Sequence, residues 1–170
     1  DQLSRRGQAI ASEWCLHLDI CRQLWRIWGC PHVDLFATKL TKRLPLYVSA
    51  LPDPLALAVD ALSIPWDRMA VYAFPPFALL RMVLNKIMAS QHLTVILIAP
   101  WWPAREWFPD LLDLCVDHPR RLPLWKILLK QPRNHRFHEG LAGLNLPAWM
   151  LLRRDFRQGL PAGSHAQLRS

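Results

Sequence analysis

The sequence predicts an α/β fold in which helices cover both faces of a mostly parallel, Rossmann-like sheet. Two observations predict it. Short apolar runs rich in β-branched residues alternate with longer segments whose apolar residues recur at helical spacing. The chain also has 170 residues, 52% of them hydrophobic and 20% charged, so one domain can bury a substantial core. Ligands of such sheets bind at the carboxyl ends of the strands, here residues 34–38, 74–77 and 100–103.

The first third of the chain is expected to hold one helix and two short strands. The helix is expected over residues 19–28, because Asp19 can cap it, its apolar side chains fall on one face and Gly29 can end it. The strands are expected over 32–37 and 47–48, and a basic stretch that ends in a proline separates them.

The middle of the chain continues the alternation. The prolines that follow the second strand predict loops around at most a short helix at 54–62. A strand is expected over 69–73. A double proline ends it, and a helix with one apolar stripe is expected over 78–89.

The clearest strand is expected over residues 94–98, a continuous β-branched run of the kind found in central parallel strands. Prolines close this run, and a helix is expected over 105–116. Beyond Pro123 the pattern is weaker and predicts helices at 124–131 and 147–153.

Positive charge is concentrated in the last third of the chain. The net charge is +8, yet residues 1–118 hold 11 Lys or Arg against 11 Asp or Glu, whereas residues 119–170 hold 10 against 2. A basic segment with interleaved aromatic side chains favours DNA or RNA as a partner. A solvated basic tail without a partner is the alternative. The expected nucleic-acid-binding residues are Arg120, Arg121, Lys126, Lys130, Arg133 and Arg136.

Asp34 is the candidate for binding a nucleotide-like cofactor. A carboxylate at the end of a strand can accept hydrogen bonds from an amine or a ribose hydroxyl. A glycine-rich turn normally accompanies it, but Thr38 and Lys39 stand at that place. A structural aspartate at a strand end is the alternative interpretation.

The double proline is the candidate for binding a nucleobase. The rigid pair Pro75 and Pro76 can aim a backbone carbonyl at an amino group while Phe77 stacks on a base. The residue before the prolines should then accept a hydrogen bond from that amine, and Phe74 cannot. Simple packing of an aromatic turn is therefore the alternative.

Neither a metal site nor a membrane segment is expected. Cys115 and His118, together with His135 and His138, have a spacing that zinc tolerates, but Cys115 lies on an apolar helical face and the second pair lies among arginines. The four cysteines form no obvious framework and are expected to be reduced thiols of an intracellular protein. No apolar run approaches the roughly 20 residues that span a bilayer.

The opening residues "DQLSRR" resemble the end of the RNase H domain of a reverse transcriptase. The string "WGCPHVDLFATKLTKRLPLYVS", continued by "DALSIPWDRMAVYAFPPFALL" and "VILIAPWWPAREWF", resembles the segment after RNase H in the pol polyproteins of DIRS-like, tyrosine-recombinase retrotransposons. This resemblance implies the tail of an RNase H-like domain (1–12), an α/β domain (13–118) and a basic extension that completes the domain and leads to a linker (119–170). It also implies other polyprotein domains as partners and a location in cytoplasm and nucleus.

The same segment is similar, more distantly, to phage-type DNA adenine methyltransferases of the Dam group. The matching residues are Asp34, Asp60-Ala61-Leu62, Trp66, Pro75-Pro76-Phe77, the run 95–100 and Trp107-Phe108. The resemblance implies a small methyltransferase-like fold, an S-adenosylmethionine pocket at Asp34, Phe36 and Asp60, and a base-binding loop at Pro75, Pro76 and Phe77. The chain departs from the family at Phe74, which replaces the Asn or Asp that orients the target amine, and at Thr38, which replaces a glycine of the cofactor turn.

Three functions follow as expectations. The preferred one is a degenerate methyltransferase-like domain that serves as a nucleic-acid-binding or structural module, because loss of one preorganised polar group costs roughly 10²–10³ in rate. The second is an active S-adenosylmethionine-dependent DNA adenine methyltransferase. The third is an inert spacer that holds the RNase H and recombinase domains in register.

Overall fold

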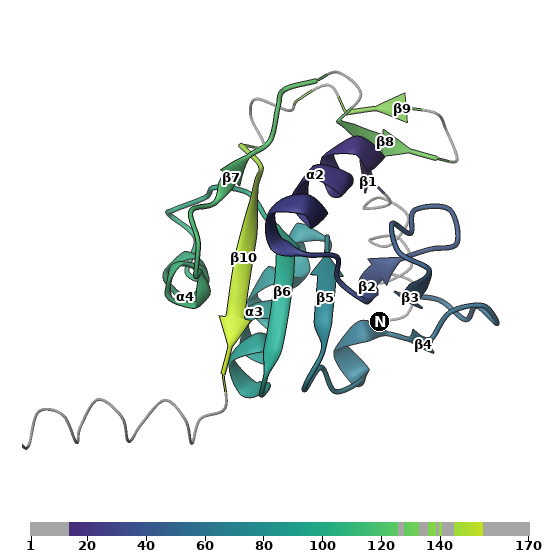
Figure 1. Ribbon diagram of the computed structural model, residues 1–170, viewed down its shortest axis with the longest axis horizontal. Helices are drawn as coiled ribbons and strands as arrows, with labels where there is room; N and C mark the ends of the chain where they lie inside the picture. The colour runs from purple at the N-terminus through teal and green to yellow at the C-terminus, as the bar shows by residue number, and fades with distance from the viewer. Residues whose placement is uncertain (1–13, 126–127, 133–135, 139, 141–144, 155–170) are drawn as a thin grey trace, which may run out of the picture.

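The computed structural model describes residues 14–125, 128–132, 136–138, 140 and 145–154. A seven-stranded sheet forms its centre, with the strand order β4-β3-β2-β5-β6-β10-β7 (Figure 1). The strands are β2 (Val33–Ala37), β3 (Leu46–Ser49), β4 (Ala58–Val59), β5 (Ala70–Ala73), β6 (Leu93–Ile98), β7 (Arg120–Arg121) and β10 (Pro147–Arg153). The four strands expected in the first hundred residues are therefore present.

The sheet is mostly parallel, as predicted. Strands β4, β3, β2, β5 and β6 pair in parallel, and β10 pairs antiparallel with both β6 and β7. The predicted helix at 147–153 is wrong, because these residues are strand β10. The run pairs with β6 from Ala148 opposite Ile98 to Arg153 opposite Leu93, so long-range pairing overrides the helix preference of Leu and Met.

A second, three-stranded sheet consists of β1 (Cys15–Leu16), β8 (Leu129–Gln131) and β9 (Arg136–Phe137), in the order β1-β8-β9 with antiparallel pairing. The helix predicted at 124–131 is wrong for residues 129–131, because Leu129 pairs with Leu16 and is buried. Residues 126–127 lie outside the described part of the chain.

The helices are α2 (Leu18–Trp28), α3 (Leu80–Ala89) and α4 (Phe108–Leu114), with the 3-10 turns η1 (Ala61–Ser63) and η2 (Phe77–Leu79). Helix α2 begins one residue before the expected start, because the His17 side chain rather than Asp19 is its N-cap. The short helix expected at 54–62 is replaced by β4 and η1. None of the helices in the described ranges is long and apolar enough to cross a bilayer.

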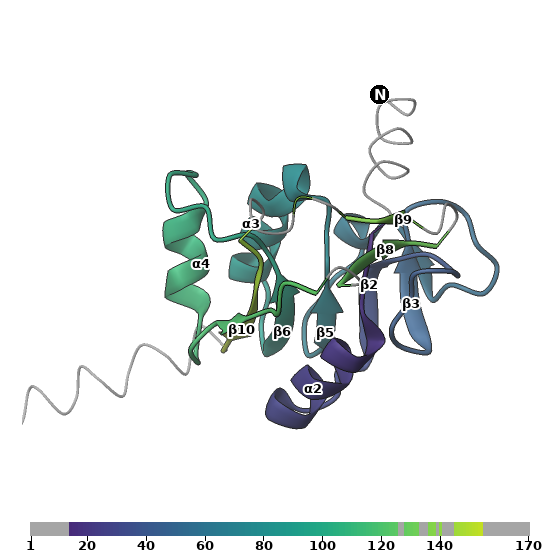
Figure 2. The ribbon, with the colours of Figure 1, turned by 90° about the horizontal axis from the view of Figure 1, so that it is seen from above.

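Successive residues of the strands point to opposite faces of the sheet and belong to two hydrophobic clusters. The first cluster takes Val71 and Ala73 of β5 together with buried residues of α3 and α4. The second takes Tyr72 of β5 together with buried residues of α2 and of the small sheet, among them Leu24 and Leu129. Figure 2 shows α2 below the row of strands and α3 above it, with α4 at the end of the row beside β10.

Candidate nucleic-acid interface

The carboxyl ends of the five parallel strands meet at one edge of the large sheet, which we call the carboxyl edge. From β2 the chain proceeds to β3 and β4 on one side, and it returns to β5 and β6 on the other side of β2. The order therefore reverses between β2 and β5, the position at which open α/β sheets bind ligands. The small sheet β1-β8-β9 lies beyond this edge (Figure 1).

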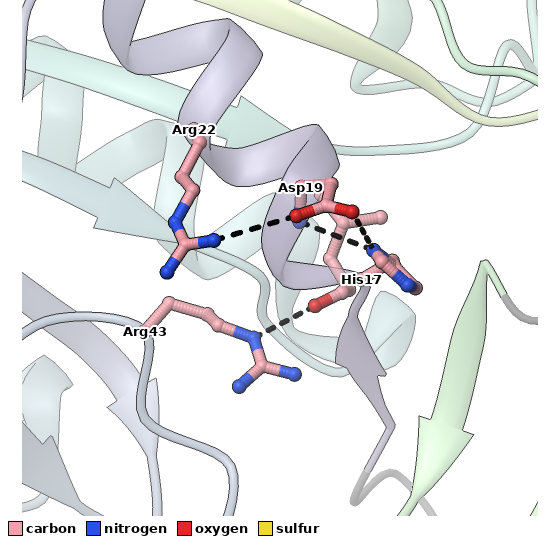
Figure 3. Close-up of polar contacts among 5 residues, drawn as sticks. His17, Asp19, Arg22 and Arg43 are labelled. Atoms are coloured by element: carbon pink, nitrogen blue, oxygen red, sulfur yellow. Dashed lines mark hydrogen bonds and ion pairs between the residues drawn. The ribbon is translucent and has the colours of Figure 1, made fainter.

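Arg43, in the loop that follows β2, joins the carboxyl edge to the small sheet. Its Nε donates a hydrogen bond to the carbonyl of Leu16 at 2.7 Å, and a terminal nitrogen lies 3.1 Å from Sγ of Cys15. Figure 3 shows this arginine reaching toward the junction of β1 and α2, close to His17, Asp19 and Arg22. The charge of Arg43 is thus held at the carboxyl edge of the large sheet.

The double-proline loop leaves the end of β5 at the same edge. Pro75 is buried and Pro76 caps η2 with an extended backbone, which fixes the direction of the chain. The rings of Phe74 and Phe77, 6.4 Å apart, are partly buried and pack against the second cluster, which also contains Leu128 and Leu129. The loop predicted to hold a base is therefore packed against the cluster that contains the apolar residues of the basic segment.

Phe77 also belongs to an aromatic rim along the ends of β5 and β6. Its ring meets that of Trp102 edge-on at 5.3 Å, and the guanidinium of Arg105 lies 5.0 Å from the centre of the Trp102 ring. These side chains can stack on a base, but Phe74 offers no oxygen to an amine. The loop therefore offers aromatic rings, and no hydrogen-bond acceptor from the side chain of Phe74, at the end of β5.

Asp34 is buried beneath α2 and is not presented at the carboxyl edge. The residue is 2% exposed, and Oδ2 accepts a hydrogen bond from the backbone N–H of Arg43 at 2.9 Å. Burial raises the pKa of Asp34 to about 7 and outweighs the opposing effect of the Arg43 N–H. The carboxylate of Asp34 contributes to the raised pKa of the buried groups Cys21 and Tyr72, for which burial is the main cause, so Asp34 lies among them within the fold and not on its surface.

Phe36 and Asp60 also have structural roles. The pairing of β2 with β3 shifts between Asp34 and Ala37, and Phe36 packs on the first cluster with its ring edge-on to Trp66 at 6.3 Å. Asp60 has a φ of 64°, and its Oδ1 accepts a hydrogen bond from the N–H of Leu62, which caps η1.

The surroundings of these residues do not fit S-adenosylmethionine. After β2 the chain forms a turn in which the backbone N–H of Thr38 donates to Oγ1 of Thr41 at 2.8 Å, and β3 follows without an intervening helix. A cofactor turn of the usual kind needs small residues and a helix N-terminus behind it. With Asp34 buried and Asp60 used as a cap, the expected cofactor groups are engaged elsewhere.

The predicted basic residues lie in two separate places. Arg120 and Arg121 form β7 at the far edge of the large sheet, whereas Lys130 and Arg136 lie in β8 and β9 (Figure 1). Lys126 and Arg133 fall outside the described residues. The basic segment therefore does not form one continuous strip through its described members.

Arg120 is occupied by local contacts. Its guanidinium lies 3.1 Å from Oδ2 of Asp117 and 5.8 Å from the centre of the Trp28 ring. Nε1 of Trp28 donates to the same carboxylate oxygen at 2.8 Å, so these three side chains fasten the end of α2 to β7. Arg121 is exposed beside them.

Sequence reasoning missed Arg43. The stretch 39–45 was expected to be basic, but nothing in the pattern indicated that it would meet the small sheet. The sequence did offer one indication, because Arg43 lies in the loop that follows a strand ending at the carboxyl edge.

No group of three His, Cys, Asp or Glu able to hold a zinc ion occurs in the described part of the chain, and His135 lies outside it.

Comparison with models of protein families and with curated proteins found no match to the chain. The assignment of a function therefore depends on the geometry above and on the motifs in the sequence.

Proposed function

We propose that this chain is a nucleic-acid-binding module with a Rossmann-like, methyltransferase-related fold that does not transfer methyl groups, and that it belongs to the polyprotein of a DIRS-like retrotransposon. The order of its parallel strands corresponds to 3-2-1-4-5 when they are numbered along the chain, as in doubly wound sheets. The position of α2 opposite α3 in Figure 2 supports helices on both faces.

One observation carries the proposal: the small sheet brings part of the basic segment back to the carboxyl edge. Leu129 of β8 packs in the same cluster as Phe74 and Phe77, and Lys130 follows it directly. Arg43 reaches the same sheet from the loop after β2. Cations thus gather where a sheet of this kind binds its ligand, and cations are what phosphate groups require.

The absence of catalysis is supported by three side chains. Phe74 packs against the second cluster and has no hydrogen-bond acceptor, Asp34 is buried with a raised pKa, and Asp60 caps η1. Methyl transfer to an amino group needs a positioned acceptor and a cofactor, and both are compromised here. The fold is retained, while Phe74 and Asp34 are part of the packed interior and Asp60 caps η1.

The test is a salt titration of binding. Fluorescence anisotropy of labelled DNA and RNA is measured with the whole chain at rising salt concentrations. The proposal predicts that log K falls linearly with log salt, with a slope of roughly −0.7 to −0.9 for each phosphate neutralised. Affinity that is indifferent to salt would refute it.

A calorimetric titration with S-adenosylmethionine tests the second part. The proposal predicts no heat of binding at millimolar cofactor, because the residues expected to hold it are buried or engaged. Saturable binding that is lost in Asp34→Ala would instead support an active methyltransferase.

A spacer function is the second candidate, and exposed apolar side chains near β4 favour it. Leu51, Leu55, Leu57 and Val59 are 40% to 68% exposed around this edge strand, and such patches mark contacts with other proteins or domains. If the patch contacts neighbouring domains, the isolated chain self-associates and Leu55→Ser with Leu57→Ser reverses this in sedimentation. A monomer that sediments identically with and without the two substitutions would speak against it.

A further inference from the structure

The register of the small sheet places a cation and an aromatic ring on one face. Cys15 lies opposite Lys130, and Lys130 lies opposite Phe137. Opposed residues of an antiparallel pair have their side chains on the same face. Leu16 and Leu129 alternate with them and face the second cluster, so Lys130 and Phe137 lie on the other side.

The same face continues past the end of β1. The backbone N–H of His17 donates to the carbonyl of Leu128 at 2.8 Å, at a bend where Leu128 turns into the second cluster. Alternation along β1 then sets His17 on the side of Cys15. The ring of Trp125 meets that of His17 edge-on at 5.9 Å. Arg43 covers Cys15 from this side. We call His17, Arg43, Trp125, Lys130 and Phe137 the aromatic–basic face.

Two large rings on this face are open to solvent. Trp125 is 41% exposed and Phe137 is 43% exposed, although each could bury more surface in a core. The neighbouring carboxylate, Asp19, lies 3.5 Å from a guanidinium nitrogen of Arg22, which offsets its charge (Figure 3). The exposed ring of Phe137 lies opposite Lys130, and that of Trp125 lies against His17, so this side of the small sheet presents stacking surface and positive charge together.

We propose that the aromatic–basic face binds single-stranded nucleic acid by stacking bases on Phe137 and Trp125 while Arg43 and Lys130 contact phosphates. The inference rests on the proposed nucleic-acid-binding function and specifies its ligand. Every base has a face that can stack, so this mode is tolerant of sequence. A duplex hides the faces of its bases and offers phosphates alone, so it binds less tightly to this surface.

The test compares single strands with their duplex by anisotropy at one salt concentration. Phe137→Ala and Trp125→Ala are each expected to weaken single-strand binding roughly 5- to 150-fold, the range that loss of one stacked base implies. The same variants leave duplex binding unchanged within about twofold, because phosphate contacts persist. Leu112→Ala, which truncates an exposed side chain on α4, is the control and retains wild-type affinity.

A conservative pair separates stacking from folding. Phe137→Tyr retains the ring and is expected to retain single-strand affinity, whereas Phe137→Leu keeps an apolar side chain and loses the stacking face. Parallel measurements with DNA and RNA strands show which of the two is preferred. Equal affinities for single strand and duplex, with Phe137→Leu equal to wild type, would overturn this inference but leave the salt-dependent function intact. Failure of every nucleic acid to bind would instead refute the proposed function itself.

Discussion

At the scale of single residues, Phe74 is the position that most favours a binding module over an enzyme. In the motif that this chain resembles, a polar side chain would stand there, and here a ring packs against the second cluster near Phe77. Under the proposed function, a hydrophobic contact stands where that motif has a catalytic hydrogen bond. The polar residues that were expected to bind a cofactor, Asp34 and Asp60, are buried in the fold or cap a 3-10 turn.

Phe74→Asn restores the polar residue of the motif and tests this view. The variant is expected to lose roughly 1–3 kcal/mol of unfolding free energy, because a partly buried ring is removed from the cluster, and to gain no methyl transfer. Urea unfolding and transfer of label from S-adenosylmethionine to DNA measure the two outcomes. Phe74→Leu, which keeps the packing, is the control. Labelled DNA after incubation with Phe74→Asn would show that a working cofactor site survives.

Asp34 makes stability depend on pH. Its folded pKa of about 7 lies above the ordinary value near 3.9, so between these pH values the folded state holds a proton that the unfolded state has lost. Stability therefore falls as pH rises from about 4 to about 7. The Asn side chain in Asp34→Asn cannot ionise, so the variant lacks this pH dependence. Its unfolding free energy relative to that of wild type is therefore expected to rise by on the order of 2–4 kcal/mol from pH 4 to pH 7.

Urea unfolding at pH 4.5, 6 and 8 measures this gain. Asp53→Asn is the control, because the hydrogen bond from Tyr47 lowers the pKa of Asp53, so this group titrates below the measured range and its difference from wild type should stay constant from pH 4.5 to 8. A difference between Asp34→Asn and wild type that stays constant with pH would show that Asp34 is ionised in the fold at all these values.

At the scale of elements, the contact that joins α2 to β7 depends on one carboxylate, that of Asp117. Asp117 accepts hydrogen bonds from Trp28 and from the N–H of His118 and pairs with Arg120, with the Trp28 bond as the main cause, and its pKa falls to about 2. The stability it contributes is present above about pH 4 and is lost as the pH falls through about 2.

Asp117→Asn is expected to lower the melting temperature at pH 7 and to narrow its gap to wild type at pH 2.5, where the wild-type carboxylate is partly protonated. Differential scanning fluorimetry at the two pH values measures the effect. Asp113→Asn, an exposed position on α4, serves as the matched control and should leave both melting temperatures unchanged. An equal loss in the two variants would remove Asp117 from this role.

Elements differ in how far the sequence predicts them. The strands at β2, β5 and β6 are apolar runs bounded by proline or polar residues, and local pattern is enough to find them. The sequence of strand β10 predicts a helix, because Leu and Met occur readily in both helices and strands. Its strand conformation depends on pairing with β6, which joins residues about 50 to 60 positions apart in the chain. Short strands such as β8 and β9 depend on pairing in the same way.

At the scale of the whole molecule, the sequence predicts the parallel sheet but only part of the candidate site. Alternation of strands and helices predicts a parallel sheet and therefore a carboxyl edge with Phe74 to Phe77 on it. It does not predict that Asp34 faces α2, because a shift of one residue would turn that side chain to the other face. It also does not predict the contact of Arg43 with β1, which depends on how the small sheet docks.

A matched pair of charge reversals tests whether positive charge at the carboxyl edge binds nucleic acid, as proposed. Lys130 lies in the small sheet beyond that edge, whereas Arg68 is exposed just before β5, at the opposite edge. Lys130→Glu and Arg68→Glu change the net charge equally. Lys130→Glu is expected to weaken binding of DNA and RNA strands and to reduce the salt slope by about 1, while Arg68→Glu changes neither. Equal losses in the two variants would contradict the proposal.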